Sequence, residues 1–338
     1  MRILVTGGAG FIGSNFIHYL FKHYSDLVVV NLDKLTYAGN LANLLDIEKK
    51  YKNSKYFFIH GDIANRELVA AILEQYQLEV IVNFAAESHV DRSIFNAYPF
   101  VQTNVVGTQN LLECAKKAKI QKFIHISTDE VYGSLGKEGK FSESTPLAPN
   151  SPYSASKAGA DFLCRSYFKT YGFPVIITRC SNNYGPFQFP EKLIPLTFLR
   201  AMKDEPIPVY GQGENVRDWI FVEDHCYGID LAMQRGKPGA IYNFGGNAEK
   251  KNIEVVKAIL DFLGKPHSLI TFVKDRPGHD FRYAMDFSYA QKELGFSPRI
   301  SFEKGLEITL KWYQNNLDWI SQIQSGEYLT FMETWYGK

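Results

Sequence analysis

A chain of 338 residues with 45% hydrophobic and 22% charged side chains has the composition of an ordinary globular protein with a large core. Its 37 basic and 36 acidic side chains nearly cancel, which excludes the strongly basic surface of a nucleic-acid-binding or membrane-binding protein. No stretch approaches the roughly 20 apolar residues of a membrane span, and we expect no signal peptide at the N-terminus.

Four cysteines are spread along the chain without a Cys-x-x-Cys pair or a Cys/His cluster; they are Cys114, Cys164, Cys180 and Cys226. This spacing argues against a structural zinc site and against a disulfide scaffold. We therefore expect reduced, mostly buried thiols in a cytoplasmic protein, and no metal.

Seven short apolar runs alternate with longer stretches of helical pattern. They lie at residues 2–6, 27–32, 56–60, 79–84, 122–127, 174–179 and 240–244. Runs rich in β-branched residues suit strands that are buried on both faces, and the stretches between them are long enough for crossover helices. The alternation predicts an α/β fold built on a doubly wound parallel sheet.

The pattern changes after about Tyr184, where Pro and Gly become frequent. We expect one helix near 191–203 and another over 219–234 that returns to the sheet. This organisation predicts a nucleotide-binding domain and a smaller, mixed α/β substrate domain, with the ligand in the cleft between them. The first comprises residues 1–184 with returning segments near 219–245, and the second comprises residues 185–338.

Three glycines, Gly7, Gly10 and Gly13, follow the first predicted strand and open a helix. Glycine lets the backbone approach a pyrophosphate closely, and the free N–H groups of the helix start bind its phosphates. Asp33 stands twenty residues after Gly13, at the end of the second strand, where a carboxylate accepts hydrogen bonds from an adenosine ribose. A carboxylate there repels a 2′-phosphate, so the pattern indicates a Rossmann-type site for NAD in preference to NADP.

Other cofactor contacts are expected from strand ends and from the segments around the motifs. Small side chains such as Ala85 and Ala86 leave room for a cofactor across the sheet edge, and Asp62 and Ile63 are placed to flank the adenine. The full expected set is Gly7, Gly10, Phe11, Ile12, Gly13, Asp33, Lys34, Thr36, Asp62, Ile63, Ala85, Ala86, Ser88, Thr103, Tyr153, Lys157 and Asn183.

Tyr153 and Lys157 form a second motif. Ser151 and Pro152 are typical of the N-cap and first residue of a helix, so Tyr153 and Lys157 share one helical face. A phenol titrates near ~10, and we expect the Lys157 ammonium to lower the pKa of Tyr153. Such a pair accepts a proton from a sugar hydroxyl while a hydride leaves the same carbon.

Together the two motifs resemble the extended short-chain dehydrogenase/reductase family over nearly the whole chain. The family pattern also has a Ser or Thr near the end of the strand before the Tyr helix, which Thr128 matches. The resemblance implies reversible oxidation of an alcohol by NAD. It also implies a homodimer formed through two long helices, expected here over 96–119 and 151–171.

Two adjacent carboxylates, Asp129 and Glu130, follow Thr128. A 4,6-dehydratase needs a base for the C5 proton of the oxidised sugar and an acid for the C6 hydroxyl, whereas an epimerase needs neither. An ionised carboxylate raises the proton affinity of its neighbour, which suits this division. The alternative is a polar turn with two solvated acids.

Several segments are similar to the nucleotide-sugar 4,6-dehydratases and agree with their dTDP-glucose group; they are residues 85–93, 127–133, 152–161, 179–186, 190–195, 216–219 and 276–280. The resemblance implies conversion of dTDP-glucose to dTDP-4-keto-6-deoxyglucose, with Asp129 as general acid and Glu130 as base. Catalytic residues are then Thr128, Asp129, Glu130, Tyr153 and Lys157. One departure is the stretch before Asn252, which lacks the His that this family usually carries there.

The same resemblance implies the substrate contacts Ser88, His89, Thr128, Asn182, Lys192, Leu193, Pro208, Tyr210, Arg217, Asn252, Arg276 and His279. Cationic side chains there would neutralise a diphosphate. For Lys192 and Arg217 a solvated surface charge is the competing interpretation, and for His89 and His279 it is a structural hydrogen bond.

Four rival functions remain open at this point. UDP-glucose differs from dTDP-glucose by one methyl, worth only ~1–3 kcal/mol in a pocket. A UDP-sugar 4-epimerase or decarboxylase has no use for the acid pair. A GDP-mannose 4,6-dehydratase is expected to have Ser in place of Asp129 and a second strand adapted to NADP. A non-catalytic NAD sensor typically loses the Tyr or the Lys.

Overall fold

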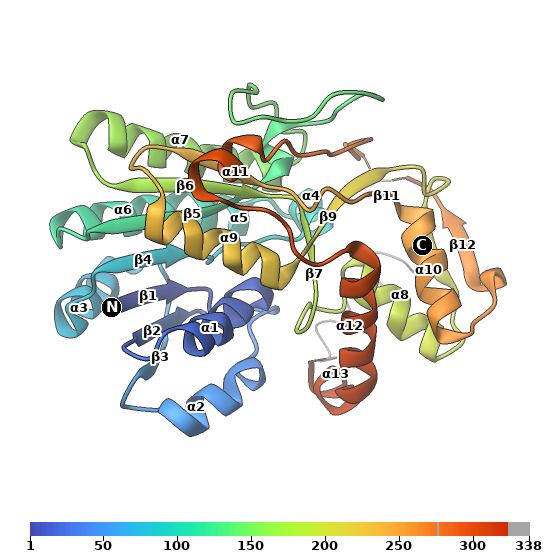
Figure 1. Ribbon diagram of the computed structural model, residues 1–338, viewed down its shortest axis with the longest axis horizontal. Helices are drawn as coiled ribbons and strands as arrows, with labels where there is room; N and C mark the ends of the chain where they lie inside the picture. The colour runs from blue at the N-terminus through green and yellow to red at the C-terminus, as the bar shows by residue number, and fades with distance from the viewer. Residues whose placement is uncertain (276, 324–338) are drawn as a thin grey trace.

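The computed structural model describes residues 1–275 and 277–323. A seven-stranded, all-parallel sheet forms its centre, in the strand order β10-β6-β5-β4-β1-β2-β3 (Figure 1). The strands are β1 (Arg2–Thr6), β2 (Val28–Asp33), β3 (Tyr56–His60), β4 (Val80–Asn83), β5 (Lys122–Thr128), β6 (Val175–Cys180) and β10 (Ile241–Phe244). All seven predicted strands are present within one residue of their expected bounds, and the α/β fold is confirmed.

Helices cover both faces of this sheet, as its continuous apolar runs require. One face is covered by α1 (Phe11–His23) and α9 (Val222–Arg235), which contribute Phe16 and Ile229 to a shared core. The other is covered by α3 (Arg66–Tyr76), α6 (Thr108–Lys117) and α7 (Pro152–Tyr171). In a parallel sheet the carboxyl ends of all strands meet at one edge, and this edge carries the site described below.

Two expected helices differ from the structure. Residues 219–221 belong to strand β9 (Val216–Phe221), and helix α9 begins only at Val222. The aromatic side chains of Trp219 and Phe221 bury in a core cluster from this strand, which pairs with β7 (Asn182–Tyr184) and β11 (Glu249–Lys251). The prediction mistook a mixed apolar pattern for helix because short apolar runs are ambiguous between the two periods.

The helix expected over 96–119 is composite. It comprises α5 (Tyr98–Phe100), a π-helical segment over Val101–Gly107 and then α6, all preceded by the short α4 (Val90–Phe95). By contrast, α7 agrees with the prediction: Ser151 accepts from the Ser154 amide in a capping box, and Pro152 is its first residue.

Beside the large sheet lie two smaller ones, β11-β9-β7 and β12-β8 (Figure 1). The flanking elements are α8 (Leu193–Met202), β8 (Ile207–Tyr210), α10 (Asn252–Leu263), β12 (Ile270–Val273), α11 (Ser288–Leu294), α12 (Phe302–Asn315) and α13 (Leu317–Ile323). The shorter elements are α2 (Leu45–Tyr51) and the 3-10 turns Leu41–Leu44, Asp129–Tyr132 and His267–Leu269. No helix within residues 1–275 and 277–323 is long and apolar enough to span a membrane. All four cysteines are buried, unpaired thiols.

Candidate active site

The turn between β1 and α1 requires glycine. Gly7 has a φ of 69°, and a Cβ at this position would lie 2.6 Å from the amide nitrogen of Ala85. A Cβ on Gly13 would lie 2.3 Å from the carbonyl oxygen of Gly7. The turn over residues 7–13, the glycine cradle, therefore has no room for a side chain at Gly7 or Gly13. A pyrophosphate can approach the backbone closely only where side chains are absent.

Asp33 closes the cradle from the end of β2. Its two carboxylate oxygens accept 2.8 Å hydrogen bonds from the backbone amides of Ala9 and Leu35. Burial raises the pKa of Asp33, while these two amides act in the opposite direction. Lys34 beside it pairs with Asp62 (Nζ–Oδ2 2.7 Å), so its charge is directed away from Asp33 toward a carboxylate.

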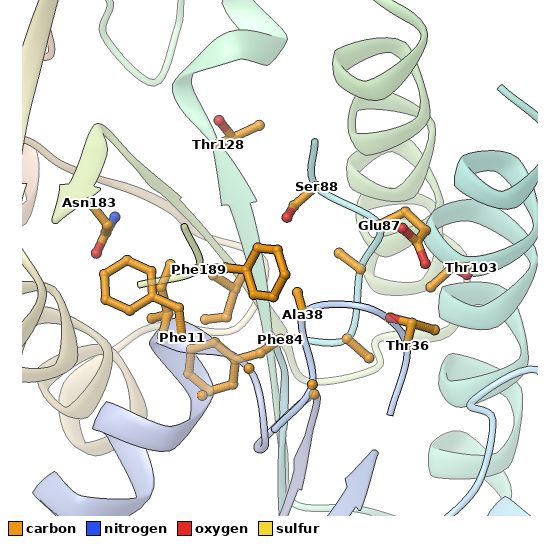
Figure 2. A pocket seen from close by; sticks show the side chains of 18 of the residues that line it. Phe11, Thr36, Ala38, Phe84, Glu87, Ser88, Thr103, Thr128, Asn183 and Phe189 are labelled. Atoms are coloured by element: carbon orange, nitrogen blue, oxygen red, sulfur yellow. The ribbon is translucent and has the colours of Figure 1, made fainter. Parts of the chain in front are cut away.

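One elongated pocket runs from this cradle to the end of β5 (Figure 2). Every residue expected to bind the cofactor lines it, including Thr36, Thr103 and Asn183. Figure 2 shows the aromatic rings of Phe11, Phe84 and Phe189 and the hydroxyl-bearing side chain of Thr128 in this pocket. A glycine cradle, a ribose-binding carboxylate and an elongated, partly apolar pocket fit a bound NAD.

The acid pair forms the 3-10 turn Asp129–Tyr132 at the far end of the same pocket. Asp129 is 2% exposed, and Thr128 Oγ1 donates a 3.2 Å hydrogen bond to its Oδ1. Burial raises the pKa of Asp129 well above its usual range, and the charges of Glu130 and Asp218 add to the effect. This environment favours the protonated form of Asp129, and because the side chain is buried the interpretation as two solvated acids is wrong for this residue.

Glu130 lies where the cofactor pocket meets a second compartment, and it lines both. It is less buried than Asp129. The two carboxyl groups therefore occupy different environments although they are adjacent in sequence, a difference that separates an acid from a base.

Tyr153 and Lys157 face the pocket from α7, with exposures of 8% and 4%. The expected lowering of the pKa of Tyr153 is wrong for this structure. Burial raises that pKa well above 10, reinforced by the charge of Glu130, whereas a hydrogen bond with Thr128 acts in the opposite direction. Lys157 instead donates to the carbonyl oxygen of Ile126 (2.6 Å), and burial lowers its own pKa.

The second compartment gathers the expected substrate contacts. It is lined by His89, Asn182, Lys192, Leu193, Pro208, Tyr210, Arg217, Asn252 and His279. Ser88 and Thr128 line the cofactor pocket instead, and Asn182 and Lys192 line both. Arg276 lies outside the described residues.

Arg217 is not a solvated surface charge. It is 5% exposed, and its guanidinium donates to the carbonyl oxygens of Asp280 (2.9 Å) and Val216 (2.8 Å) while lying 4.3 Å from the ring centroid of Tyr283. Lys192 donates to the Ser88 carbonyl at 3.1 Å, so it bridges the two compartments.

The two histidines make structural hydrogen bonds and also line the compartment. His89 Nδ1 accepts from the backbone amide of Arg92 (3.3 Å) as the cap of α4, and His279 Nδ1 lies 2.6 Å from Asp275 Oδ1.

Glu191 and Tyr283 line the substrate compartment but were not singled out from the sequence. Glu191 is 4% exposed, and burial raises its pKa to about 7, opposed by Lys192 and by Arg92, which donates at 3.1 Å. Glu191 could have been singled out from the sequence, because it stands next to Lys192 in the 190–195 segment. Tyr283 gave no such signal, because it reaches the site only through the packing of 280–285 against β9.

Comparison with known proteins decides the family. Residues 4–309 match the family described as GDP-mannose 4,6 dehydratase. The chain is 51% identical to the dTDP-glucose 4,6-dehydratase of Xanthomonas campestris pv. campestris, over 96% of both chains. It belongs to the nucleotide-sugar 4,6-dehydratase family.

Solved structures of 4,6-dehydratases superpose on nearly the whole chain. The dTDP-glucose 4,6-dehydratase DesIV of Streptomyces venezuelae, with NAD and TYD bound, gives a TM-score of 0.92 at 49% identity, covering 96% of this chain and 100% of its own. The enzyme of Bacillus anthracis str. Ames, in complex with NAD, gives 0.89 at 50% identity, covering 96% and 99%. The resemblance drawn from the motifs is thereby confirmed.

Proposed function

We propose that this protein is an NAD-dependent hydro-lyase that converts dTDP-glucose into dTDP-4-keto-6-deoxyglucose. One observation carries the proposal: the turn with Asp129 and Glu130 opens into the same pocket as Tyr153 and Lys157. A pocket with only the second pair would support oxidation and its reversal, whereas the carboxyl pair adds the means to eliminate water.

In the oxidation half, Tyr153 accepts the proton of the C4 hydroxyl, and the Thr128 hydroxyl, which donates to Asp129 in this structure, would turn to hold the C4 oxygen by a hydrogen bond. Bound NAD would supply the hydride acceptor at C4 and the hydride donor at C6. Burial and the charge of Glu130 disfavour the Tyr153 phenolate. Tyr153 must lose its own proton before it can act as the base, and a nearby cation favours that ionised form. Lys157, four residues further along α7, is the cation that we assign to this role.

In the elimination half, Glu130 removes the C5 proton, which the new C4 ketone has made acidic. Asp129 donates its proton to the C6 oxygen, so the C6–O bond breaks and water leaves. Glu130 later returns a proton to C5 when C6 receives hydride. The raised pKa of buried Asp129 and the more accessible position of Glu130 support this assignment.

The nucleotide end would lie in the second compartment. We propose that Lys192 and Arg217 offset the diphosphate charge, and that Asn182, Asn252 and His279 hydrogen-bond the substrate. Much of this lining follows Tyr184 in the chain, which supports the proposed division into a cofactor domain over 1–184 with 219–245 and a substrate domain over 185–338.

A panel of dTDP-, UDP-, CDP- and GDP-hexoses tests the proposal, with the product detected by mass loss of one water. We expect dTDP-glucose to give the highest kcat/KM. Comparable kcat/KM for UDP-glucose would leave a broader pyrimidine-sugar dehydratase, isomerisation without water loss would favour a 4-epimerase, and no reaction would favour a sensor.

We also propose a homodimer in the cytoplasm. Large apolar side chains are exposed on α4, on the composite helix after it and on α7, namely Phe95 (76%), Tyr98 (70%) and Phe162 (58%). Because α4 and α5 both pack against α7, these side chains supply one continuous face for a second copy. Sedimentation of Phe162→Glu checks this: a shift from dimer toward monomer is expected, and an unchanged dimer would contradict it. The buried, unpaired thiols agree with a reducing compartment.

A further inference from the structure

Arg179 lies outside the pocket and contacts two of the segments that build the active site. It lies on β6 and is paired with Ser127 of β5 on one side and with Asn243 of β10 on the other. Its Nε donates a 2.9 Å hydrogen bond to Asp161 Oδ2, and its Nη1 donates a 2.8 Å hydrogen bond to the hydroxyl of Tyr132. None of these three side chains belongs to the described lining of the pocket or of the second compartment.

The first partner belongs to the oxidation machinery. Asp161 lies on α7 four residues after Lys157, which in turn lies four residues after Tyr153. Residues at this spacing share one face of a helix. The hydrogen bond to Asp161 therefore fixes the face of α7 that presents Tyr153 and Lys157.

The second partner belongs to the elimination machinery. Tyr132 is the last residue of the 3-10 turn that begins at Asp129. Its hydroxyl donates in turn to Asn243 Oδ1 at 2.8 Å, and the Arg179 guanidinium lies 4.7 Å from its ring centroid. The turn that carries the acid pair is thus tied at its far end to the same guanidinium.

The connection is stiff because it is buried and charged. Arg179, Asp161 and Tyr132 are 3%, 2% and 3% exposed. A guanidinium is planar, and its donors point in fixed directions, so the two acceptors cannot shift relative to each other without loss of a buried hydrogen bond.

We propose that Arg179 is a positioning residue that holds the Tyr153–Lys157 face of α7 and the Asp129–Glu130 turn in one fixed relation. The 4-keto sugar then meets its acid and base without a rearrangement of the site after oxidation. This inference rests on the proposed dehydratase function, because only that reaction uses both groups on one substrate.

Tyr132→Phe is the sharpest test, since it removes the hydrogen bonds of the hydroxyl with Arg179 and Asn243 and keeps the buried ring. We expect oxidation at C4 to remain close to wild type and elimination to slow roughly ten- to a hundredfold, the scale of a small misplacement of reacting groups. Absorbance of the reduced nicotinamide during turnover of dTDP-glucose then shows accumulation that wild type lacks, while KM for dTDP-glucose stays unchanged.

Tyr56→Phe is the matched control. Tyr56 is 2% exposed, and its hydroxyl accepts a 2.9 Å hydrogen bond from Asn31, so the variant loses a buried tyrosine hydroxyl elsewhere in the sheet. We expect a similar loss in the free energy of unfolding without accumulation of reduced cofactor. Equal kinetics of the two variants would overturn the proposal.

Arg179→Lys extends the test to the other end of the link. Lysine keeps the charge but cannot hold both partners, so Tyr132→Phe should add little to its defect in the double variant. Additive effects on the elimination rate would contradict a shared link. Wild type that fails to dehydrate dTDP-glucose would refute the proposed function itself, which separates that failure from failure of the inference.

Discussion

The hydroxyl of Thr128 donates a 3.2 Å hydrogen bond to Oδ1 of Asp129, whereas Oδ2 of the same buried carboxyl group has no hydrogen-bond partner among the described residues. The hydroxyl fixes the orientation of the carboxyl group, and the second oxygen is buried without a partner in the described part of the chain that would stabilise a negative charge on it. A carboxyl group in this setting is suited to donate a proton to a leaving hydroxyl.

Asp129→Asn keeps the shape of the side chain but has no acidic proton to deliver. Because general acid catalysis contributes ~10²–10⁴-fold, turnover should fall by about that factor. Hydride transfer precedes this step, so reduced nicotinamide should accumulate in single-turnover absorbance traces. Near-normal turnover would mean that Asp129 is not the acid.

Glu130→Gln should block removal of the C5 proton. Wild type in deuterated water should place deuterium at C5 of the product. The variant should form little product and show almost no C5 exchange in the sugar recovered from the enzyme, as read by mass spectrometry. Brisk C5 exchange in Glu130→Gln would assign the base to another residue.

Tyr153→Phe should nearly stop oxidation at C4, because no acceptor for the hydroxyl proton remains. Stopped-flow absorbance of the nicotinamide with excess dTDP-glucose measures this step directly. Lys157→Met should have a similar defect, with the pH optimum of any residual activity displaced upward. Normal reduction in Tyr153→Phe would show that a different group is the base.

Asp218→Asn should change the pH dependence of elimination. Burial raises the pKa of Asp218 to about 6, so it is ionised above that pH, and its charge helps raise the pKa of Asp129. In the proposed mechanism the acid form of Asp129 is the active one, and it is lost as pH rises through its pKa. Removal of the neighbouring charge lowers that pKa, so the alkaline limb of kcat should move to lower pH.

A matched control for this prediction is Asp230→Asn. Asp230 is buried on α9, where it accepts hydrogen bonds from Tyr19 and Tyr24, whereas the charges that raise the pKa of Asp129 are those of Glu130 and Asp218. The alkaline limb should stay in place in this variant. An equal displacement in both variants would count against a local effect of Asp218.

Asp33→Asn should weaken the preference for NAD. The amide still offers one oxygen to the backbone amides of Ala9 and Leu35, but it loses the charge that binds ribose and repels a 2′-phosphate. Hydrogen bonds to charged groups contribute ~1.5–3 kcal/mol, so Kd for NAD should rise roughly ten- to a hundredfold. Calorimetric titration with both cofactors checks this, and equal affinities in wild type would contradict the assignment.

Much of the fold was determined by local sequence. Seven apolar runs became seven parallel strands because a strand buried on both faces leaves a continuous apolar signature. The local backbone geometry was equally predictable at Gly7 and Gly13 and at the Ser151–Pro152 start of α7. At each of these places the geometry depends on residues close by in the chain. The presence of an acid pair at Asp129 and Glu130 was visible in the same way.

Tertiary structure decided the electrostatics, because burial depends on segments far apart in the chain. Sequence suggested that Lys157 lowers the pKa of Tyr153, yet enclosure by the strand ends and by Glu130 raises it. For Arg217 the sequence left a substrate contact and a solvated surface charge as alternatives, and only packing against residues 280–283 showed that the side chain is buried.

The distinction between the two acids also came only from the fold. Adjacent residues in an irregular turn have no fixed periodicity, so nothing local predicts that Asp129 is enclosed while Glu130 faces both compartments. The same holds for Arg179, whose partners Tyr132 and Asp161 lie 47 and 18 residues away along the chain. Sequence determined which chemical groups this protein carries, and tertiary packing determined their protonation and their relative placement, because both depend on which distant segments exclude water from a given side chain.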